Sequence, residues 1–233
     1  MYTIALETSS TAGSLALLQD STLVHEIALP RQTRTAQTFA PALQQALRQA
    51  GWSPRQVDLF AICRGPGSFT GLRIAVTAAK VYAYATGCHV LGLNTLEVIA
   101  AQATAEAGMH IWTVLDAQRG QLFAARFLRV PEGVQLVGKT RVLDIDPWLA
   151  GLRSGDTVSG PGLRGCQTRV PGNVHVVDPQ RWAPRAATVG RLAGERFQAG
   201  ERQDAWSLIP EYFRLSAAEE KVVQVAKEEP RSR

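Results

Sequence analysis

Short apolar runs separated by polar turns fill the first thirty residues of the chain. The runs cover residues 2–7, 14–19 and 22–29, and the turns between them are rich in serine, threonine, glycine and aspartate. This pattern predicts three β-strands connected as an antiparallel meander. Residues 35–50 then place apolar side chains three to four positions apart, which predicts a helix that ends at Gly51.

The rest of the first half alternates between strand-like and helix-like segments. Residues 59–63 and 90–93 are short apolar runs typical of buried strands, whereas residues 72–86 and 96–107 have the length of helices. The predicted order of the first half is therefore three strands, a helix, and then two further strands that are each followed by a helix.

The second half begins like the first. A strand-like run ending in a carboxylate, a turn containing glycine, and a returning run occur at residues 4–18 and again at residues 111–128, which indicates an internal duplication. Later segments predict strands at 134–137, 157–159 and 174–177 and helices near 147–152 and 188–199. We therefore expect an α/β protein with a mixed sheet in each of two lobes, residues 1–108 and 109–216, and a charged, disordered tail at 217–233.

The most distinctive local motif is the string RGPGSFTGLR at residues 64–73, between a predicted strand and a predicted helix. Its glycines allow an unusual backbone and close approach of another chain segment, and Ser68 and Thr70 can cap the helix. A phosphate-binding P-loop needs Gly-Lys-Ser/Thr, but this chain has leucine and arginine after Gly71. The motif excludes a P-loop NTPase and leaves two interpretations, a tight turn that binds nothing or an anion site at a helix start.

Composition further narrows the class of protein. The three cysteines, Cys63, Cys88 and Cys166, are far apart and form no CxxC, which favours a reducing compartment without disulfides. No apolar segment approaches a membrane span and no signal peptide is evident, so we expect a cytoplasmic protein. The net charge is +5, but the arginines are scattered and not interleaved with aromatic residues, which argues against direct sequence-specific binding of nucleic acid.

Four motifs together resemble the bacterial TsaB (YeaZ) family. They are LETS at 6–9, GPGSFTGLR at 65–73, DAQRG at 116–120 and IPEYFR at 209–214, and the resemblance extends from residue 1 to about residue 216. It implies the two-lobed actin/Hsp70/sugar-kinase (ASKHA) fold. It also implies a role in the synthesis of threonylcarbamoyladenosine (t6A) beside the anticodon of ANN-decoding tRNAs.

The resemblance further implies a non-catalytic subunit that binds and activates a TsaD-like threonylcarbamoyltransferase. A TsaE-like ATPase is a further implied partner, a homodimer is expected in isolation, and tRNA is reached only through the complex. The alternative is an autonomous ATP-dependent phosphotransferase or ATP-binding protein of the same fold. The family has also been called glycoprotease-like (M22), but Ser68 is not in a Gly-x-Ser-x-Gly elbow, so peptidase activity is not expected.

Neither a metal centre nor a complete nucleotide site is expected. The four histidines are isolated, and residues 33–39 stand where metal-binding relatives have a histidine pair. Glu7 replaces the aspartate more usual in the family, and Pro161 interrupts the second glycine pair. We therefore expect no intrinsic cofactor and at most weak or partner-dependent binding of ATP or ADP, through vestigial contacts of Glu7, Thr8, Ser9, Gly67, Ser68, Thr70, Asp116 and Arg119.

The predicted helix at 72–86 is apolar on almost every side and must be covered on every side. Its alanines would let another helix approach closely. The sequence therefore predicts a helical interface with a partner, formed by Phe39, Leu43, Ala75, Ala79, Tyr82 and Tyr84. The alternative is that the helix at 35–50 and the sheet cover it within one molecule.

Overall fold

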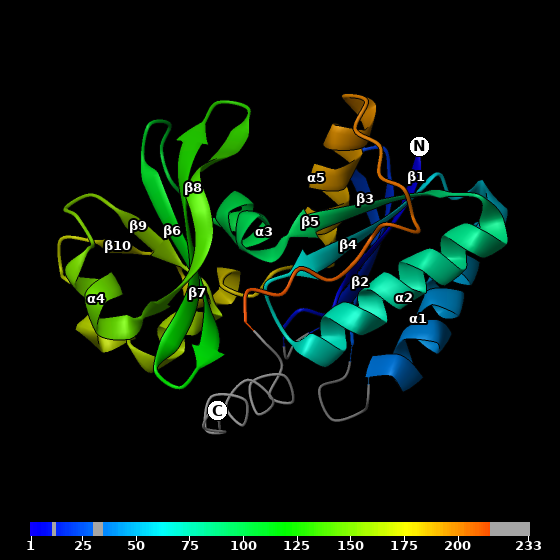
Figure 1. Cartoon of the computed structure of the whole chain (residues 1–233). Helices are drawn as coiled ribbons and strands as arrows, with labels where there is room; N and C mark the ends of the chain where they lie inside the picture. The colour runs from blue at the N-terminus through cyan, green and yellow to red at the C-terminus, as the bar shows by residue number, and fades with distance from the viewer. Residues whose placement is uncertain (11–12, 30–34, 215–233) are drawn as a thin grey trace, which may run out of the picture.

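A computed structural model of the chain describes residues 1–10, 13–29 and 35–214 and shows two lobes, each built around a five-stranded sheet (Figure 1). The first sheet has the order β3-β2-β1-β4-β5, and the second has the order β10-β9-β6-β7-β8. The first contains β1 (Tyr2–Glu7), β2 (Ser14–Gln19), β3 (Thr22–Ala28), β4 (Leu59–Gly65) and β5 (His89–Asn94). The second contains β6 (His110–Gln118), β7 (Gln121–Val130), β8 (Gly133–Asp144), β9 (Thr157–Ser159) and β10 (His175–Val176).

The two sheets share one topology. In each, the first three strands pair antiparallel, and the two later strands pair parallel on the other side of the first strand. Strand β1 thus corresponds to β6, β4 to β9, and β5 to β10. The predicted α/β fold with two duplicated mixed sheets is confirmed.

Helices cover both faces of the first sheet. Helices α1 (Thr35–Ala50) and α2 (Phe69–Thr86) pack on one face, with Leu47 and Val76 among the buried side chains. Helix α5 (Ala186–Gln198) packs on the other face, where Val189 and Ala193 meet β1 and β2.

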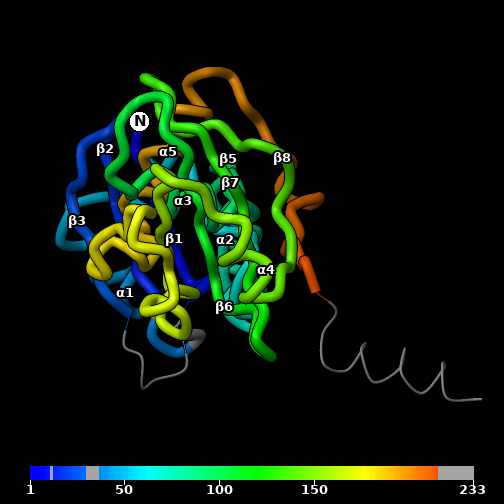
Figure 2. The backbone as a smooth tube through the Cα atoms, turned by 90° about the vertical axis from the view of Figure 1, so that its left-hand side faces the viewer, coloured from blue at the N-terminus to red at the C-terminus, as the bar shows by residue number. Residues whose placement is uncertain are grey.

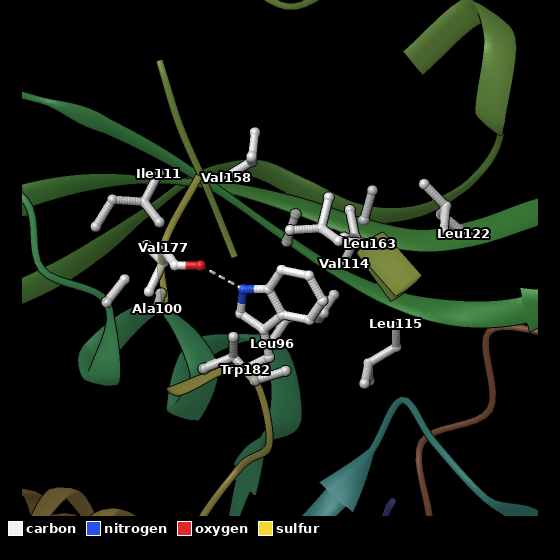
Figure 3. Close-up of a cluster of buried hydrophobic side chains, with 14 of the residues drawn as sticks. Leu96, Ala100, Ile111, Val114, Leu115, Leu122, Val158, Leu163, Val177 and Trp182 are labelled. Carbon is white, nitrogen blue, oxygen red and sulfur yellow. Dashed lines mark hydrogen bonds between the residues drawn. The ribbon is translucent and has the colours of Figure 1, made fainter. Parts of the chain in front are cut away.

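The second sheet is covered by shorter elements. Helix α3 (Thr95–Gln102) packs on it from the side of the first lobe, and α4 (Ile145–Ala150) lies beside β8. Short 3-10 helices occupy Pro54–Gln56, Pro161–Gly165, Gln167–Arg169 and Pro179–Arg181. Figure 3 shows the core of this lobe, in which Leu96 and Ala100 of α3 surround the indole of Trp182 together with strand residues. The Trp182 Nε1 donates a 2.7 Å hydrogen bond to the carbonyl oxygen of Val177, so the buried indole has a polar partner.

The position of α5 corrects the expected division of the chain. Residues 109–216 were expected to form the second lobe, but α5 packs on the first sheet, and Trp206 and Glu211 after it are hydrogen-bonded to the first lobe. Gly190 lets the helix lie close, because an added Cβ there would overlap with the side chain of Leu18. The expected disordered tail at 217–233 lies outside the described residues.

Two further properties are visible in the described part of the chain. Cys63, Cys88 and Cys166 are all free thiols, as predicted. Of the helices at residues 35–198, none combines the length and the apolar character that crossing a membrane requires.

Candidate functional site

The turn between β4 and α2 is packed against the turn that follows β1. Ser68 is the N-cap of α2, with its Oγ accepting a 3.3 Å hydrogen bond from the N–H of Gly71, and its own N–H donates to the carbonyl of Ser9 at 2.7 Å. A Cβ on Gly67 would overlap with that same carbonyl of Ser9. The predicted cap at Ser68 is confirmed, and it starts the helix at Phe69, earlier than the predicted residue 72.

Gly65 packs against a third backbone segment, which contains Glu211. A Cβ there would overlap with the carbonyl of Glu211, and the Glu211 N–H donates a 2.7 Å hydrogen bond to the carbonyl of Arg64. The glycines of the motif therefore allow three backbone segments to approach one another. This favours the interpretation of the motif as a structural turn.

Glu211 belongs to a segment, residues 205–214, that we call the strap. The strap is the orange stretch after α5 in Figures 1 and 2 and runs beside α2. Lys80 donates a 2.9 Å hydrogen bond to the carbonyl of Trp206, and the ring of Tyr212 stacks on Phe69 with centroids 3.9 Å apart. The Tyr212 hydroxyl accepts a 3.0 Å hydrogen bond from Nε of Arg73. These contacts hold the strap along the first lobe.

The end of the strap reaches the second lobe. Arg214 donates a 2.7 Å hydrogen bond to the carbonyl of Ala117, and the rings of Phe213 and Phe123 lie edge to face at 6.5 Å. The strap thus connects the two lobes. Sequence analysis identified residues 209–214 only as a family motif and missed this role, which depends on contacts between residues far apart in the chain.

A cleft of about 700 Å³ lies where the two lobes and the strap meet. It brings together six of the predicted contact residues, namely Ser9, Gly67, Ser68, Thr70, Asp116 and Arg119. The 3-10 helix Pro161–Gly165, including Arg164, forms part of its wall, which the sequence did not indicate. Among the described residues that line this cleft there is no histidine.

Glu7 and Thr8 lie beneath the cleft and do not line it. The Glu7 carboxylate is fully buried, and it accepts hydrogen bonds from the N–H of Ser9 at 2.6 Å and from the Ser9 hydroxyl, with the Ser10 hydroxyl at 3.3 Å. Burial raises the pKa of the Glu7 carboxyl from 4.5 to about 7, and these hydrogen bonds act in the opposite direction. The Glu7 carboxyl group therefore stabilises the turn that follows β1.

Asp116, at the equivalent end of β6, is exposed in the cleft. Its Oδ1 accepts a 2.6 Å hydrogen bond from the N–H of Gln118, and Gln118 and Arg119 have positive φ angles of 63° and 55°. Non-glycine residues rarely adopt this conformation outside sites where the surrounding structure enforces it. The predicted pair of carboxylates is therefore not equivalent, since Glu7 is buried and Asp116 faces solvent.

The structure changes the predicted partner interface. Leu43, Ala75 and Ala79 are buried in the core of the first lobe, so they are not accessible to a partner, because small alanines let α2 pack closely on its own sheet. Phe39 and Tyr82 are half-buried against Phe60. Of the six predicted residues only Tyr84 is widely exposed.

Large apolar side chains are exposed on α2 and on the strap. Tyr84 and Val81 on α2 are 80% and 62% exposed, and Trp206 and Ile209 on the strap are 68% and 65% exposed. The rings of Tyr84 and Trp206 lie 6.0 Å apart. We call these four residues the α2–strap patch. Sequence analysis could not find the strap half of it, because nothing in the sequence places residues 206–209 next to α2.

Comparison with known proteins identifies related chains. Residues 29–154 match the family model described as TsaD: tRNA N6-adenosine threonylcarbamoyltransferase. The chain is 27% identical to the Bacillus subtilis tRNA threonylcarbamoyladenosine biosynthesis protein TsaB over 97% of this chain and all of that protein. It is 32% identical to the Escherichia coli TsaB over 58% of each.

Solved protein structures are also similar to this chain. YeaZ from Pseudomonas aeruginosa has a TM-score of 0.78 and 29% identity, covering 91% of this chain and 99% of that one. A second structure from the same organism, described as an uncharacterized protein with similarity to peptidase YEAZ, has a TM-score of 0.77 and 30% identity over the same shares of the two chains. With the fold, the glycine-rich turn and the strap motif, these matches show that the chain belongs to the TsaB (YeaZ) family.

Proposed function

We propose that this chain is a non-catalytic subunit of the machinery that synthesises t6A in tRNA, and that it binds and activates a TsaD-like threonylcarbamoyltransferase. The names of its TsaB relatives support the pathway. The observation that carries the subunit role is the α2–strap patch, in which four large apolar side chains are exposed and the rings of Tyr84 and Trp206 lie 6.0 Å apart.

The patch has the character of a protein-binding surface. Aromatic side chains dominate the energetics of protein interfaces, and large apolar groups exposed together usually mark an interaction site. Lys80 and Arg73 hold the strap through hydrogen bonds, so Trp206 and Tyr212 are ordered before a partner arrives. Ordering in advance lowers the entropic cost of binding. We expect the same patch to form a homodimer when the partner is absent.

The state of the carboxylates supports a non-catalytic role. Glu7 is enclosed by Ser9 and Ser10, and Asp116 already accepts a hydrogen bond from its own turn. We propose that catalysis belongs to the TsaD-like partner. A TsaE-like ATPase joins the assembly, and tRNA is contacted through the complex.

The experiment is to measure binding of the purified partner to the full chain and to variants of the patch. Tyr84→Glu and Val81→Glu should each weaken binding at least tenfold, because each places a charge in a desolvated apolar contact. Gln44→Glu, on the exposed side of α1, is the matched control and should bind normally. Ala79→Glu is unsuitable because Ala79 is fully buried. Undiminished binding by both patch variants, with unchanged thermal stability, would show that the partner binds elsewhere.

The exposed Asp116 in the interlobe cleft keeps a second candidate open, an autonomous ATP-dependent phosphotransferase. That function requires ATP turnover by the isolated chain that is lost in Asp116→Ala. The subunit role requires that the chain alone be inactive and that formation of t6A by the partner depend on adding it. Reconstitution with and without this chain separates the two.

A further inference from the structure

The two helices on the outer face of the first sheet carry only positive charges. Neither α1 nor α2 contains an aspartate or a glutamate, although the whole chain has 20 acidic residues. Their charged side chains are Arg48 on α1 and Arg73 and Lys80 on α2. The two helices lie next to each other in the first lobe (Figure 1), so this helical layer has a net positive charge.

The contacts of Arg73 and Lys80 do not neutralise their charges. Nε of Arg73 donates to the hydroxyl of Tyr212 at 3.0 Å, and Lys80 donates to the carbonyl of Trp206 at 2.9 Å. Both acceptors are uncharged, and neither cation forms an ion pair with a residue that the structure describes. The two cations therefore hold the strap and keep their full charge.

Helix α5, on the opposite face of the same sheet, is different. Its Arg191 pairs with Glu195 one turn later, and its Arg196 pairs with Glu97 of α3. The unpaired cations are thus a property of the α2 side of the lobe and not of the chain as a whole.

Two carboxylates lie in the strap or next to it, and both are engaged there. Glu211 lies 3.6 Å from Arg64. Asp204 accepts hydrogen bonds from the N–H groups of Trp206 at 3.3 Å and Ser207 at 2.9 Å, so its carboxylate is directed to the backbone of the strap. Neither carboxylate is bonded to Arg73 or Lys80.

Both cations border the α2–strap patch. Lys80 precedes Val81 in the chain and is bonded to Trp206. Arg73 comes eight residues before Val81 on the same face of α2, because side chains four residues apart share a face of a helix. Eight residues span about 12 Å of helix, a distance close to one Debye length at moderate salt. A partner seated on the patch therefore experiences both charges.

We propose that the α2–strap patch selects its partner by charge, and that the partner's contact surface is apolar at its centre and carries aspartate or glutamate side chains at its rim. This inference rests on the function proposed above and names the chemistry of the surface that the TsaD-like subunit presents. In a two-fold homodimer the same patch lies on both sides, so the cations of one copy come close to those of the other. Like charges oppose that contact, whereas opposite charges favour the partner. A nucleic acid is also anionic, but the aliphatic Val81 and Ile209 neither stack on bases nor bind phosphate.

Salt dependence separates the two kinds of association. Calorimetry measures the Kd of the purified TsaD-like partner for the full chain at about 50 mM and about 500 mM NaCl, and analytical ultracentrifugation measures self-association under the same conditions. Because salt screens charges, the partner should bind at least about threefold more weakly at the higher concentration, and the homodimer should become tighter. A partner complex that is indifferent to salt, or a homodimer that salt weakens, would overturn the proposal.

A double variant identifies charge as the cause. Arg73→Gln with Lys80→Gln removes both charges and keeps a hydrogen-bond donor at each position. It should bind the partner at least about fivefold more weakly at low salt and form the homodimer more tightly. Disorder of the strap would instead weaken both complexes, and that result, or no change in either complex, would contradict the proposal. Arg73→Lys with Lys80→Arg keeps the charges and should restore partner binding, and Arg141→Gln, at an exposed arginine on β8, is the matched control.

The patch variants distinguish this inference from the function on which it rests. Normal partner binding by both Tyr84→Glu and Val81→Glu would overturn the proposed function and this inference together. If these variants lose the partner but the double glutamine variant binds it like the wild type, the subunit role stands and selection by charge is wrong. Binding of tRNA by the isolated chain that is lost in the double glutamine variant would assign the cations to nucleic acid and would also overturn the inference.

Discussion

Gly71 faces the main chain of Thr8 so closely that a Cβ atom would overlap with the Thr8 carbonyl oxygen, and the Thr8 hydroxyl donates a 2.7 Å hydrogen bond to the carbonyl of Gly71. The two residues belong to different turns, one after β1 and one at the start of α2. Their reciprocal contact fixes the separation of these turns. The last glycine of the motif is thus explained by packing alone.

Replacing Gly71 by alanine should lower the free energy of unfolding by about 1–3 kcal/mol, as overpacking a close contact does. The direction of this change in stability is informative, because alanine normally stabilises a helix by up to about 1 kcal/mol relative to glycine. Urea denaturation measures the effect. Gly165→Ala is the control, since an added Cβ there meets open space. If both variants are equally stable, the contact with Thr8 is not tight.

Glu7 should make the stability of the protein depend on pH. Its pKa is about 7 in the folded protein against 4.5 ordinarily, so the folded state binds a proton more strongly. The free energy of unfolding should therefore fall as pH rises from about 4.5 to 7, by about 3 kcal/mol at most, and level off above that range. Glu7→Gln removes this contribution, so the free energy of unfolding of the variant should increase relative to that of the wild type as pH rises. Denaturation curves at pH 5, 6, 7 and 8 provide the measurement, and parallel curves for the two proteins would refute it.

The stack of Phe69 and Tyr212 should show energetic coupling. In a double-mutant cycle of Phe69→Ala and Tyr212→Ala, the coupling free energy should be about 1 kcal/mol, because stacked rings contribute beyond the area they bury. Hydrogen exchange in residues 205–214 should become faster in both single variants. Tyr212→Phe keeps the stack and loses only the hydrogen bond from Arg73, so it should have a smaller effect. Strict additivity would mean that the strap is held by its other contacts.

Most elements could be predicted because their signals are local. The alternation of apolar runs and turns located β1 and β2, and the helical spacing of apolar residues located α1 to the residue. The predicted strand at 134–137 was too short, because β8 continues to Asp144 by pairing with β7. Helix α3 ends at Gln102, whereas the sequence predicted that it would extend to residue 107. The apolar residues after Gln102, such as Ala103, pack in the core of the second lobe but are not helical.

The candidate site could be predicted in part. Ser9 follows β1, and Asp116 lies near the end of β6, the equivalent strand of the duplicated fold, so their meeting at one cleft follows from the topology. Arg164 and the strap could not be predicted, since their positions depend on how the lobes pack. The error at Ala75 and Ala79 has the same origin, because a run of alanines does not reveal which surface the helix packs against.

The return of α5 to the first sheet has a consequence for biosynthesis. One face of that sheet stays uncovered until Ala186 and the residues after it have left the ribosome, although its strands end at Asn94. The first-made half of the protein therefore carries an exposed apolar surface during most of translation, a condition that promotes aggregation of nascent chains. We expect the two lobes to complete folding together, after synthesis of the chain is nearly finished.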